Sequence, residues 1–244
     1  MQIRFIKRMD SADPAKDRKR WRGEMLRRVC TLWFAKMLAT TLGITAFLMT
    51  YLWVLHHPFF AVTLMPLTAL DRAIGFRPET LPLYLSLWVY ISLAPAMLQN
   101  GRELASYGLA TLALSLVGLG IFIVWPTAVP TFEIDWSQYP SMTFLKNLDL
   151  AGNACPSLHV AFAVFTAIWL ERLFCEMDAG LALRLFNWLW CIGILFSTVA
   201  TLQHVVLDVL GGAVLGAIVA ALHLRALDIS GIRTKQKGYL TIVG

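Results

Sequence analysis

Two short stretches of the sequence carry residues that could do chemistry together. The first is Pro156-Ser157-Leu158-His159, and the second places His204 four residues before Asp208. Histidine titrates near neutral pH and can serve as acid, base or nucleophile. Residues four apart on a helix share a face, so the Asp208 carboxylate can accept the imidazole N–H of His204 and fix its tautomer. Two histidines and one carboxylate predict phosphoryl transfer, in which one histidine attacks phosphorus and the other protonates the departing oxygen.

A helix start explains why a proline, a serine and a histidine stand together in the first stretch. Pro156 suits the first helical turn, where its missing N–H would be unpaired anyway. Free backbone N–H groups and the positive end of the helix dipole favour an anion at this point. Ser157 adds a hydroxyl donor to this anion site.

Other interpretations of the same residues stay open on this pattern alone. Two histidines and one carboxylate are also a ligand set for iron or zinc, which would make the protein a metal enzyme. The set could also be a structural polar pairing without chemistry. The remaining histidines are expected to be interface residues with no catalytic part; they are His56, His57 and His223.

The chain that positions these residues is strongly apolar. It has 58% hydrophobic and 15% charged residues and a mean hydropathy of +0.64, whereas a soluble domain carries about 25% charged residues. Six apolar runs approach the roughly 20 residues that cross a bilayer. They predict an all-α polytopic membrane protein, a six-helix transmembrane bundle. The spans run approximately from Leu32 to Leu55, Leu81 to Leu98, Leu104 to Trp125, Ser157 to Phe174, Leu185 to Leu202 and Val205 to Leu224. Gly212 and Gly216 in the last span predict close helix packing.

Lysine and arginine positions predict the orientation of the bundle. Basic side chains crowd residues 1–30 and recur after the last span, and cytoplasmic segments carry an excess of such residues. We therefore expect a basic cytoplasmic segment at 1–30 with an interfacial helix over 15–28, a six-span membrane catalytic domain at 31–225, and a cytoplasmic tail at 226–244. The net charge of +6 is then a sign of topology and calls for no nucleic-acid partner.

The same topology places both histidine stretches at the outer face of the membrane. The compact chain suits a bacterial cytoplasmic (inner) membrane with the site facing the periplasm. A Golgi enzyme facing the lumen would obey the same topology.

At these residues the chain resembles the type 2 phosphatidic acid phosphatase superfamily. The second motif of that family is Pro-Ser-x-His, which Pro156 to His159 match. The third is Ser-Arg, five residues, His, three residues, Asp, which Ser197 to Asp208 match except that Thr198 replaces arginine. The first motif, Lys, six residues, Arg-Pro, is absent, because Leu70 stands seven residues before Arg77.

With these departures from the family motifs, the chain resembles one branch of the superfamily, the inositol phosphorylceramide synthase (aureobasidin-resistance) group and its bacterial relatives. The Ser-Thr start of the last motif and the Gln203-His204 pair fit that group. The resemblance runs from about residue 60 to 217. Two further shared elements are a Pro-x-x-x-x-Asp and Phe-x-Pro segment before a tyrosine-bearing span, seen as Pro66, Asp71, Phe76, Pro78 and Tyr84, and a Pro-Thr-x-x-Pro element, seen as Pro126, Thr127 and Pro130.

The superfamily resemblance implies a role for each matched residue. His204 is implied to be the nucleophile that forms a phosphohistidine, Asp208 to orient it, and His159 to protonate the leaving alcohol. Ser157 is implied to help hold the phosphoryl oxygens. The family needs no metal and no other cofactor.

The family's clamping cations are missing, because Leu70 and Thr198 stand in their places. Arg77 is the replacement that we expect to bind substrate, and Arg72 and Lys146 are the other basic candidates in the outer loops.

The missing cations bear on the substrate. A phosphate monoester is close to a dianion near neutral pH, whereas a diester carries one charge. Charge-assisted contacts stabilise by roughly 1.5–3 kcal/mol each, so a site without two cations disfavours the dianion. We expect a phospholipid diester in the bilayer whose head-group phosphoryl unit passes to a lipid or polyol alcohol or to water.

Two alternatives are kept. One is a lipid phosphate monoester phosphatase of the phosphatidic acid or polyprenyl pyrophosphate type, and the other is a non-catalytic lipid-binding membrane protein. A vanadium haloperoxidase of the same superfamily is disfavoured, because that chemistry depends on the missing cations.

Overall fold

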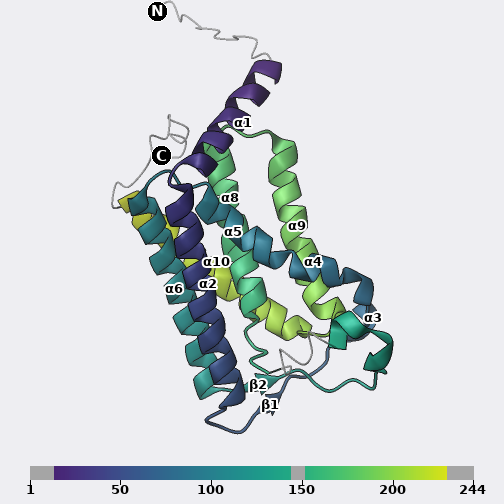
Figure 1. Ribbon diagram of the computed structural model, residues 1–244. Helices are drawn as coiled ribbons and strands as arrows, with labels where there is room; N and C mark the ends of the chain where they lie inside the picture. Colours follow the sequence, from purple (N-terminus) through teal and green to yellow (C-terminus); the bar gives the residue numbers. More distant parts are fainter. Residues whose placement is uncertain (1–13, 144–151, 230–244) are drawn as a thin grey trace, which may run out of the picture.

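The described part of the chain folds into a helical bundle with two very short strands (Figure 1). The computed structural model describes residues 14–143 and 152–229. In those ranges five helices are long and apolar enough to cross a membrane, and the predicted all-α membrane fold is confirmed. They are α2 (Trp33–His56), α6 (Gly101–Val124), α8 (Leu158–Glu176), α9 (Leu181–Ala200) and α10 (Val206–Ile229).

The predicted span from Leu81 to Leu98 differs, because it is not one continuous helix. It forms α4 (Leu81–Leu85) and α5 (Leu87–Ala96), which run obliquely across the bundle (Figure 1). Ser86 between them donates its hydroxyl to the Leu83 carbonyl at 2.6 Å. Such a side-chain contact competes with the backbone hydrogen bonds of a helix and bends it. The pair still carries the chain from one end of the bundle to the other.

The short elements gather at the end of the bundle where α8 and α10 begin, which we call the site end (Figure 1). Strand β1 (Thr63–Leu64) pairs in parallel with β2 (Thr127–Ala128). The other elements of the two long loops are α3 (Ala69–Ile74), η1 (Pro78–Thr80) and η2 (Trp136–Gln138). Helix α1 and the last turns of α10 lie at the opposite end.

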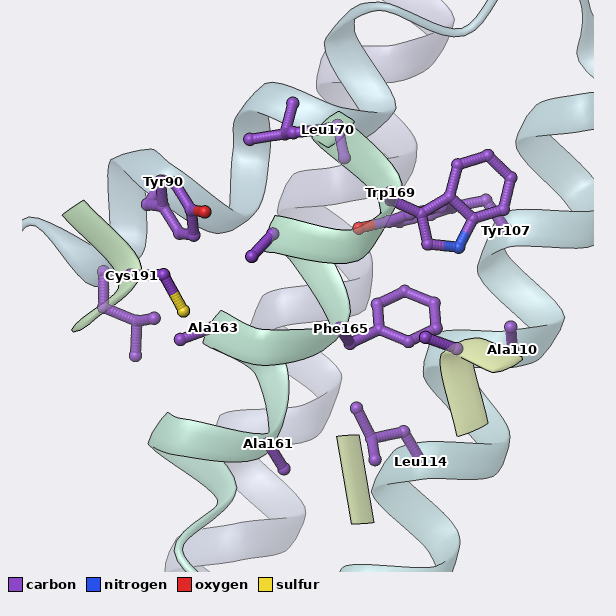
Figure 2. Packing of buried hydrophobic residues seen from close by; sticks show 14 of the residues in the cluster. Tyr90, Tyr107, Ala110, Leu114, Ala161, Ala163, Phe165, Trp169, Leu170 and Cys191 are labelled. Carbon is purple, nitrogen blue, oxygen red and sulfur yellow. The ribbon is translucent and has the colours of Figure 1, made fainter. Parts of the chain in front are cut away.

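Helix α8 lies at the centre and packs against α5, α6, α9 and α10. Figure 2 shows Phe165 and Trp169 of α8 beside Tyr107 of α6, with the Tyr107 ring 5.4 and 5.3 Å from theirs. Buried aromatic rings contribute large apolar areas to a core. The dense core anchors α8 and therefore fixes where its first turn, with His159, must lie.

Two glycines let α10 approach α8 closely. A Cβ at Gly212 would stand 2.2 Å from the Ser157 carbonyl oxygen, and one at Gly216 would stand 2.3 Å from the Ala161 carbonyl oxygen. No side chain fits at either position without movement of the backbone. The predicted role of Gly212 and Gly216 in helix packing is confirmed, and this packing sets the beginnings of α8 and α10 side by side.

Helix α1 (Pro14–Cys30) confirms the helix predicted over 15–28. Its Arg28 forms ion pairs with Glu24 at 2.9 Å and with Glu176 of α8 at 3.4 Å. Its location at the lipid interface stays a prediction, as does the division of the chain at 30 and 225. Helix α10 continues to Ile229, four residues beyond the second of those boundaries.

Candidate active site

A tight turn between α9 and α10 presents His204. The backbone N–H of Thr201 donates to the Ser197 carbonyl at 2.9 Å, and those of Gln203 and His204 both donate to the Thr198 carbonyl at 3.1 Å. These bonds satisfy carbonyls at the end of α9 that have no partner within the helix. The turn therefore holds the His204 backbone rigidly at the site end.

The His204 imidazole is oriented by two oxygen atoms. Its Nδ1 lies 3.1 Å from the Ala154 carbonyl oxygen and 3.6 Å from Asp208 Oδ2. Both oxygens are acceptors, so the hydrogen of the neutral ring belongs on Nδ1 and the lone pair on Nε2. The Nε2 atom is buried and has no hydrogen-bond partner, which leaves its lone pair free for chemistry.

Asp208 lies beside His204 and is completely buried. Its Oδ2 accepts the backbone N–H of Val205 at 2.9 Å, and its Oδ1 has no partner. The orientation of His204 is thus shared, with the Ala154 carbonyl making the shorter contact. A negative carboxylate at 3.6 Å would also stabilise positive charge that develops on the ring.

The Ala154 carbonyl is itself held by β2. Thr127 accepts the Ala154 N–H on its carbonyl at 3.2 Å and the Cys155 N–H on its hydroxyl at 2.8 Å. Thr127 belongs to the Pro-Thr-x-x-Pro element of the sequence. The element therefore places the oxygen atom that sets the tautomer of His204.

His159 is the second residue of α8 and faces His204. The two ring centroids are 5.6 Å apart. The Tyr84 hydroxyl lies 2.8 Å from His159 Nε2, and the Trp88 ring meets the same imidazole edge-on at 6.1 Å. The predicted pair of histidines is thus brought together, and a tyrosine that the sequence analysis gave no role holds one of them.

Ser157 is the N-cap of α8 and is fully buried. Its hydroxyl oxygen accepts the Val160 N–H at 3.3 Å, and its backbone N–H donates to the Asp208 carbonyl at 3.0 Å. The hydroxyl hydrogen is still available to donate. Ser157 therefore joins the two helix starts and offers one neutral donor beside them.

The loop that contains α3 contributes a carboxylate that caps α10 from a distance. Asp71 Oδ1 accepts the backbone N–H of Val206, the first residue of α10, at 2.8 Å. Asp71 Oδ2 accepts the Thr68 backbone N–H at 2.7 Å and its hydroxyl at 2.6 Å. An acidic group at a helix N-terminus stabilises it. The loop is thus fastened two residues after His204.

The basic candidates do not join this cluster. The Arg77 side chain is exposed and donates to the Ile74 carbonyl at 3.0 Å, within its own loop. Its backbone N–H, rather than its guanidinium, reaches α9 at the Ala200 carbonyl at 2.8 Å. Arg72 is exposed as well, and Lys146 lies outside the described residues. The structure thus shows no contact that would make Arg77 a phosphate clamp.

The family follows from the sequence around this site. The model of the PAP2 superfamily matches residues 101–230, more than half of the chain. The chain belongs to the PAP2 superfamily. No curated protein and no solved structure matches it. The matched range contains His159, His204 and Asp208 but begins after Asp71 and Tyr84, so the resemblance to the synthase branch stays a prediction.

A large apolar cavity extends from the site of this PAP2 protein between α2, α5, α6 and α8. Its volume is about 960 Å³, near the top of the roughly 300–1,000 Å³ typical of small-molecule pockets. His159 and Tyr84 lie in its wall at one end, and its lining is mostly leucine, isoleucine and aromatic side chains. The cavity can accept a long apolar group whose polar end lies against His159.

Proposed function

We propose that this PAP2 protein is a membrane enzyme that transfers the head-group phosphoryl unit of a phospholipid through a phosphohistidine on His204. The observation that carries the proposal is the geometry of the two histidines. Nε2 of His204 is buried, unpartnered and set up as a lone pair, and the His159 ring stands 5.6 Å away. The two rings are therefore neighbours, as a nucleophile and an acid that act on one phosphoryl group must be.

The first step forms the bond between His204 Nε2 and phosphorus as the bond from phosphorus to the lipid oxygen breaks. A ring N–H of protonated His159 gives its proton to that oxygen, which leaves as a neutral alcohol. Tyr84 occupies Nε2 of His159, so Nδ1–H is the group left to reach the leaving oxygen. Asp208 and the Ala154 carbonyl stabilise the positive charge on His204.

The second step regenerates the enzyme. An alcohol or water attacks phosphorus and gives its proton to neutral His159 while the bond to His204 breaks. His204 returns to its neutral state with the hydrogen on Nδ1. An alcohol acceptor makes the protein a phosphotransferase, and water makes it a phosphatase.

The apolar cavity supports a lipid leaving group. His159, the proposed acid, lies in the cavity wall, whereas His204 does not line it. The alcohol that His159 protonates should therefore be the one that carries the apolar chains. This arrangement leaves the phosphoryl unit, with any head group, on His204 at the site end.

The absence of a clamping cation in the described cluster supports a diester over a monoester. Thr198 stands where the family has arginine, and its hydroxyl donates to the Leu195 carbonyl at 2.8 Å. Arg77 is turned to its own loop. Apart from protonated His159, the donors that the described residues offer at the site are neutral, and these match the single charge of a diester better than a dianion.

The orientation follows from charge. Basic residues at 1–30 and after the last span favour cytoplasmic termini, which puts the site end at the outer face. We propose a bacterial inner-membrane enzyme whose site opens to the periplasm.

The test uses wild-type protein and His204→Ala, purified in detergent. Each receives phosphatidic acid, phosphatidylglycerol or phosphatidylinositol, with and without ceramide or diacylglycerol as acceptor, and lipid products are followed by mass spectrometry. His56→Ala is the matched control, because His56 is an exposed histidine with no part in the site.

We expect diacylglycerol and a transferred head group from a diester, lost in His204→Ala and kept in His56→Ala. Free phosphate from phosphatidic acid with at least a tenfold preference over every diester would make the protein a monoester phosphatase instead. Equal turnover in all three proteins, or none in any, would remove the catalytic proposal and favour a lipid-binding protein.

A further inference from the structure

Buried polar atoms without partners gather in one short stretch of this chain. Among the described residues nine buried side-chain nitrogen or oxygen atoms have no hydrogen-bond partner, and four of them belong to Gln203, His204 and Asp208. Unsatisfied buried polar groups are rare in folded proteins because they cost stability. When they cluster at a candidate active site, a catalytic role in binding a ligand is one physical explanation.

Gln203 is the member of this cluster with no role so far. Its side chain is 3% exposed, and both Nε2 and Oε1 are buried and unpartnered. Val205, two residues after it, belongs to a buried apolar cluster with Met65 and Val129. The amide is therefore held out of water on the residue that precedes the proposed nucleophile.

The backbone fixes this position. The Gln203 and His204 N–H groups share the Thr198 carbonyl as acceptor, so the two residues move as one unit. The fold therefore fixes the backbone of Gln203 relative to that of His204. Preorganised donors of this kind act without a cost of rearrangement when the ligand binds.

We propose that the Gln203 side-chain amide binds the reacting group, with Nε2–H donating to a non-bridging phosphoryl oxygen. The inference rests on the proposed function and deepens it. The amide nitrogen gains the partner that it lacks. The neutral donor takes the place of the arginine that the family has at Thr198.

This assignment agrees with the substrate class. A diester has two non-bridging oxygens that share one charge, and the neutral donors of Gln203 and Ser157 can serve one each. The Thr198 side chain cannot donate to either oxygen, because its hydroxyl donates to the Leu195 carbonyl and the side chain is fully buried. Gln203, the residue before His204, carries a buried amide that has no partner in the structure, and it is therefore our choice for this role.

The test compares Gln203→Met with Asn187→Leu, each replacing a buried amide by an apolar side chain of similar size. Both polar atoms of the Asn187 amide have a partner, because Oδ1 accepts from the Tyr90 hydroxyl at 2.7 Å and Nδ2 donates to the Ala167 carbonyl at 3.0 Å. Three quantities are measured in detergent: the melting temperature, kcat and KM for the diester that wild type turns over, and the inhibition constant of orthovanadate, a mimic of the phosphoryl group.

For Gln203→Met we expect a melting temperature equal to or above that of wild type, because an unpaired buried amide is removed. We expect kcat/KM to fall about 10- to 150-fold, the loss of one hydrogen bond to a charged group, with weaker orthovanadate inhibition. Asn187→Leu should show the reverse, with a lower melting temperature and kcat/KM near that of wild type.

A lower melting temperature in Gln203→Met with unchanged kcat/KM and orthovanadate inhibition would overturn this inference and make Gln203 structural. Unchanged values of all three quantities would overturn it as well. Failure of the proposed function is a different result, in which wild-type turnover does not depend on His204.

Discussion

The close approach of α10 to α8 makes the substitution Gly212→Ala a test of how the site is built. The new Cβ would stand 2.2 Å from the Ser157 carbonyl oxygen, whereas ordinary contact begins at 3.4 Å. The neighbour is backbone in a close-packed interface, so the helices must separate by roughly 1 Å. Ser157 lies two residues before His159 and Gly212 lies one helical turn after Asp208, so this movement widens the gap between His159 and His204.

The expected loss follows from that displacement. A misplacement of about 1 Å between reacting groups can cost roughly 100-fold in rate, and overpacking costs about 1–3 kcal/mol in the free energy of unfolding. We therefore expect kcat/KM of Gly212→Ala to fall about 100-fold, with a modest decrease in melting temperature. Turnover of the lipid substrate and thermal unfolding in detergent measure the two effects on one sample.

Two other glycines make the experiment a graded series. A Cβ at Gly211 would lie 3.3 Å from Pro156 Cβ, a mild overlap, and one at Gly120 of α6 would meet nothing within 4 Å. We expect a small activity loss in Gly211→Ala and none in Gly120→Ala, whose helix should gain about 0.5–1 kcal/mol. Activity of Gly212→Ala within about threefold of Gly120→Ala would refute the reasoning, because a 1 Å displacement should cost far more.

Three further predictions concern the residues around the histidines. Tyr84→Phe removes the hydroxyl that contacts His159 Nε2 at 2.8 Å, and kcat should fall about tenfold; an unchanged kcat would show that this contact does not support the acid. Asp71→Asn replaces the charge that caps α10 at Val206, and the free energy of unfolding should fall by about 1 kcal/mol, which a melting curve against wild type would check. The rate should be bell-shaped in pH, with an acid limb as His204 becomes protonated and a basic limb as His159 loses its proton; the acid limb should persist in His159→Gln, and its absence from both proteins would contradict the assigned roles.

The fold was predictable because hydrophobic runs of bilayer length leave few alternatives to helices. The placement of His159 and His204 at the same end of the bundle was also predictable, because one helix, α9, separates α8 from α10. The break within Leu81 to Leu98 was not predictable, because the apolar run continues through Ser86. The hydroxyl contact of Ser86 with the Leu83 carbonyl, which accompanies the bend, is visible only in the folded structure.

The side chains that meet at the candidate site were predictable from the sequence, whereas most of the contacts that hold them in place were not. The nearest partner of His204 Nδ1 is the Ala154 carbonyl, and a backbone oxygen leaves no mark in a sequence. The Asp71 contact with Val206 joins residues 135 apart. The sequence showed Gln203 only as a residue of the last motif, because the missing hydrogen-bond partners of its amide are a property of the folded turn. Arg77 was the expected replacement among three basic loop residues, but its side chain donates to a carbonyl of its own loop.

The most direct test of the account is the identity of the covalent intermediate. Wild-type protein would be mixed with its lipid substrate, quenched in alkali, digested and analysed by mass spectrometry, with His204→Ala in parallel. The account predicts an added phosphoryl unit, still carrying its head group, on the peptide that contains His204 in wild type and on no peptide of His204→Ala. Rapid turnover with the added mass on another residue, or full activity in His204→Ala, would contradict it.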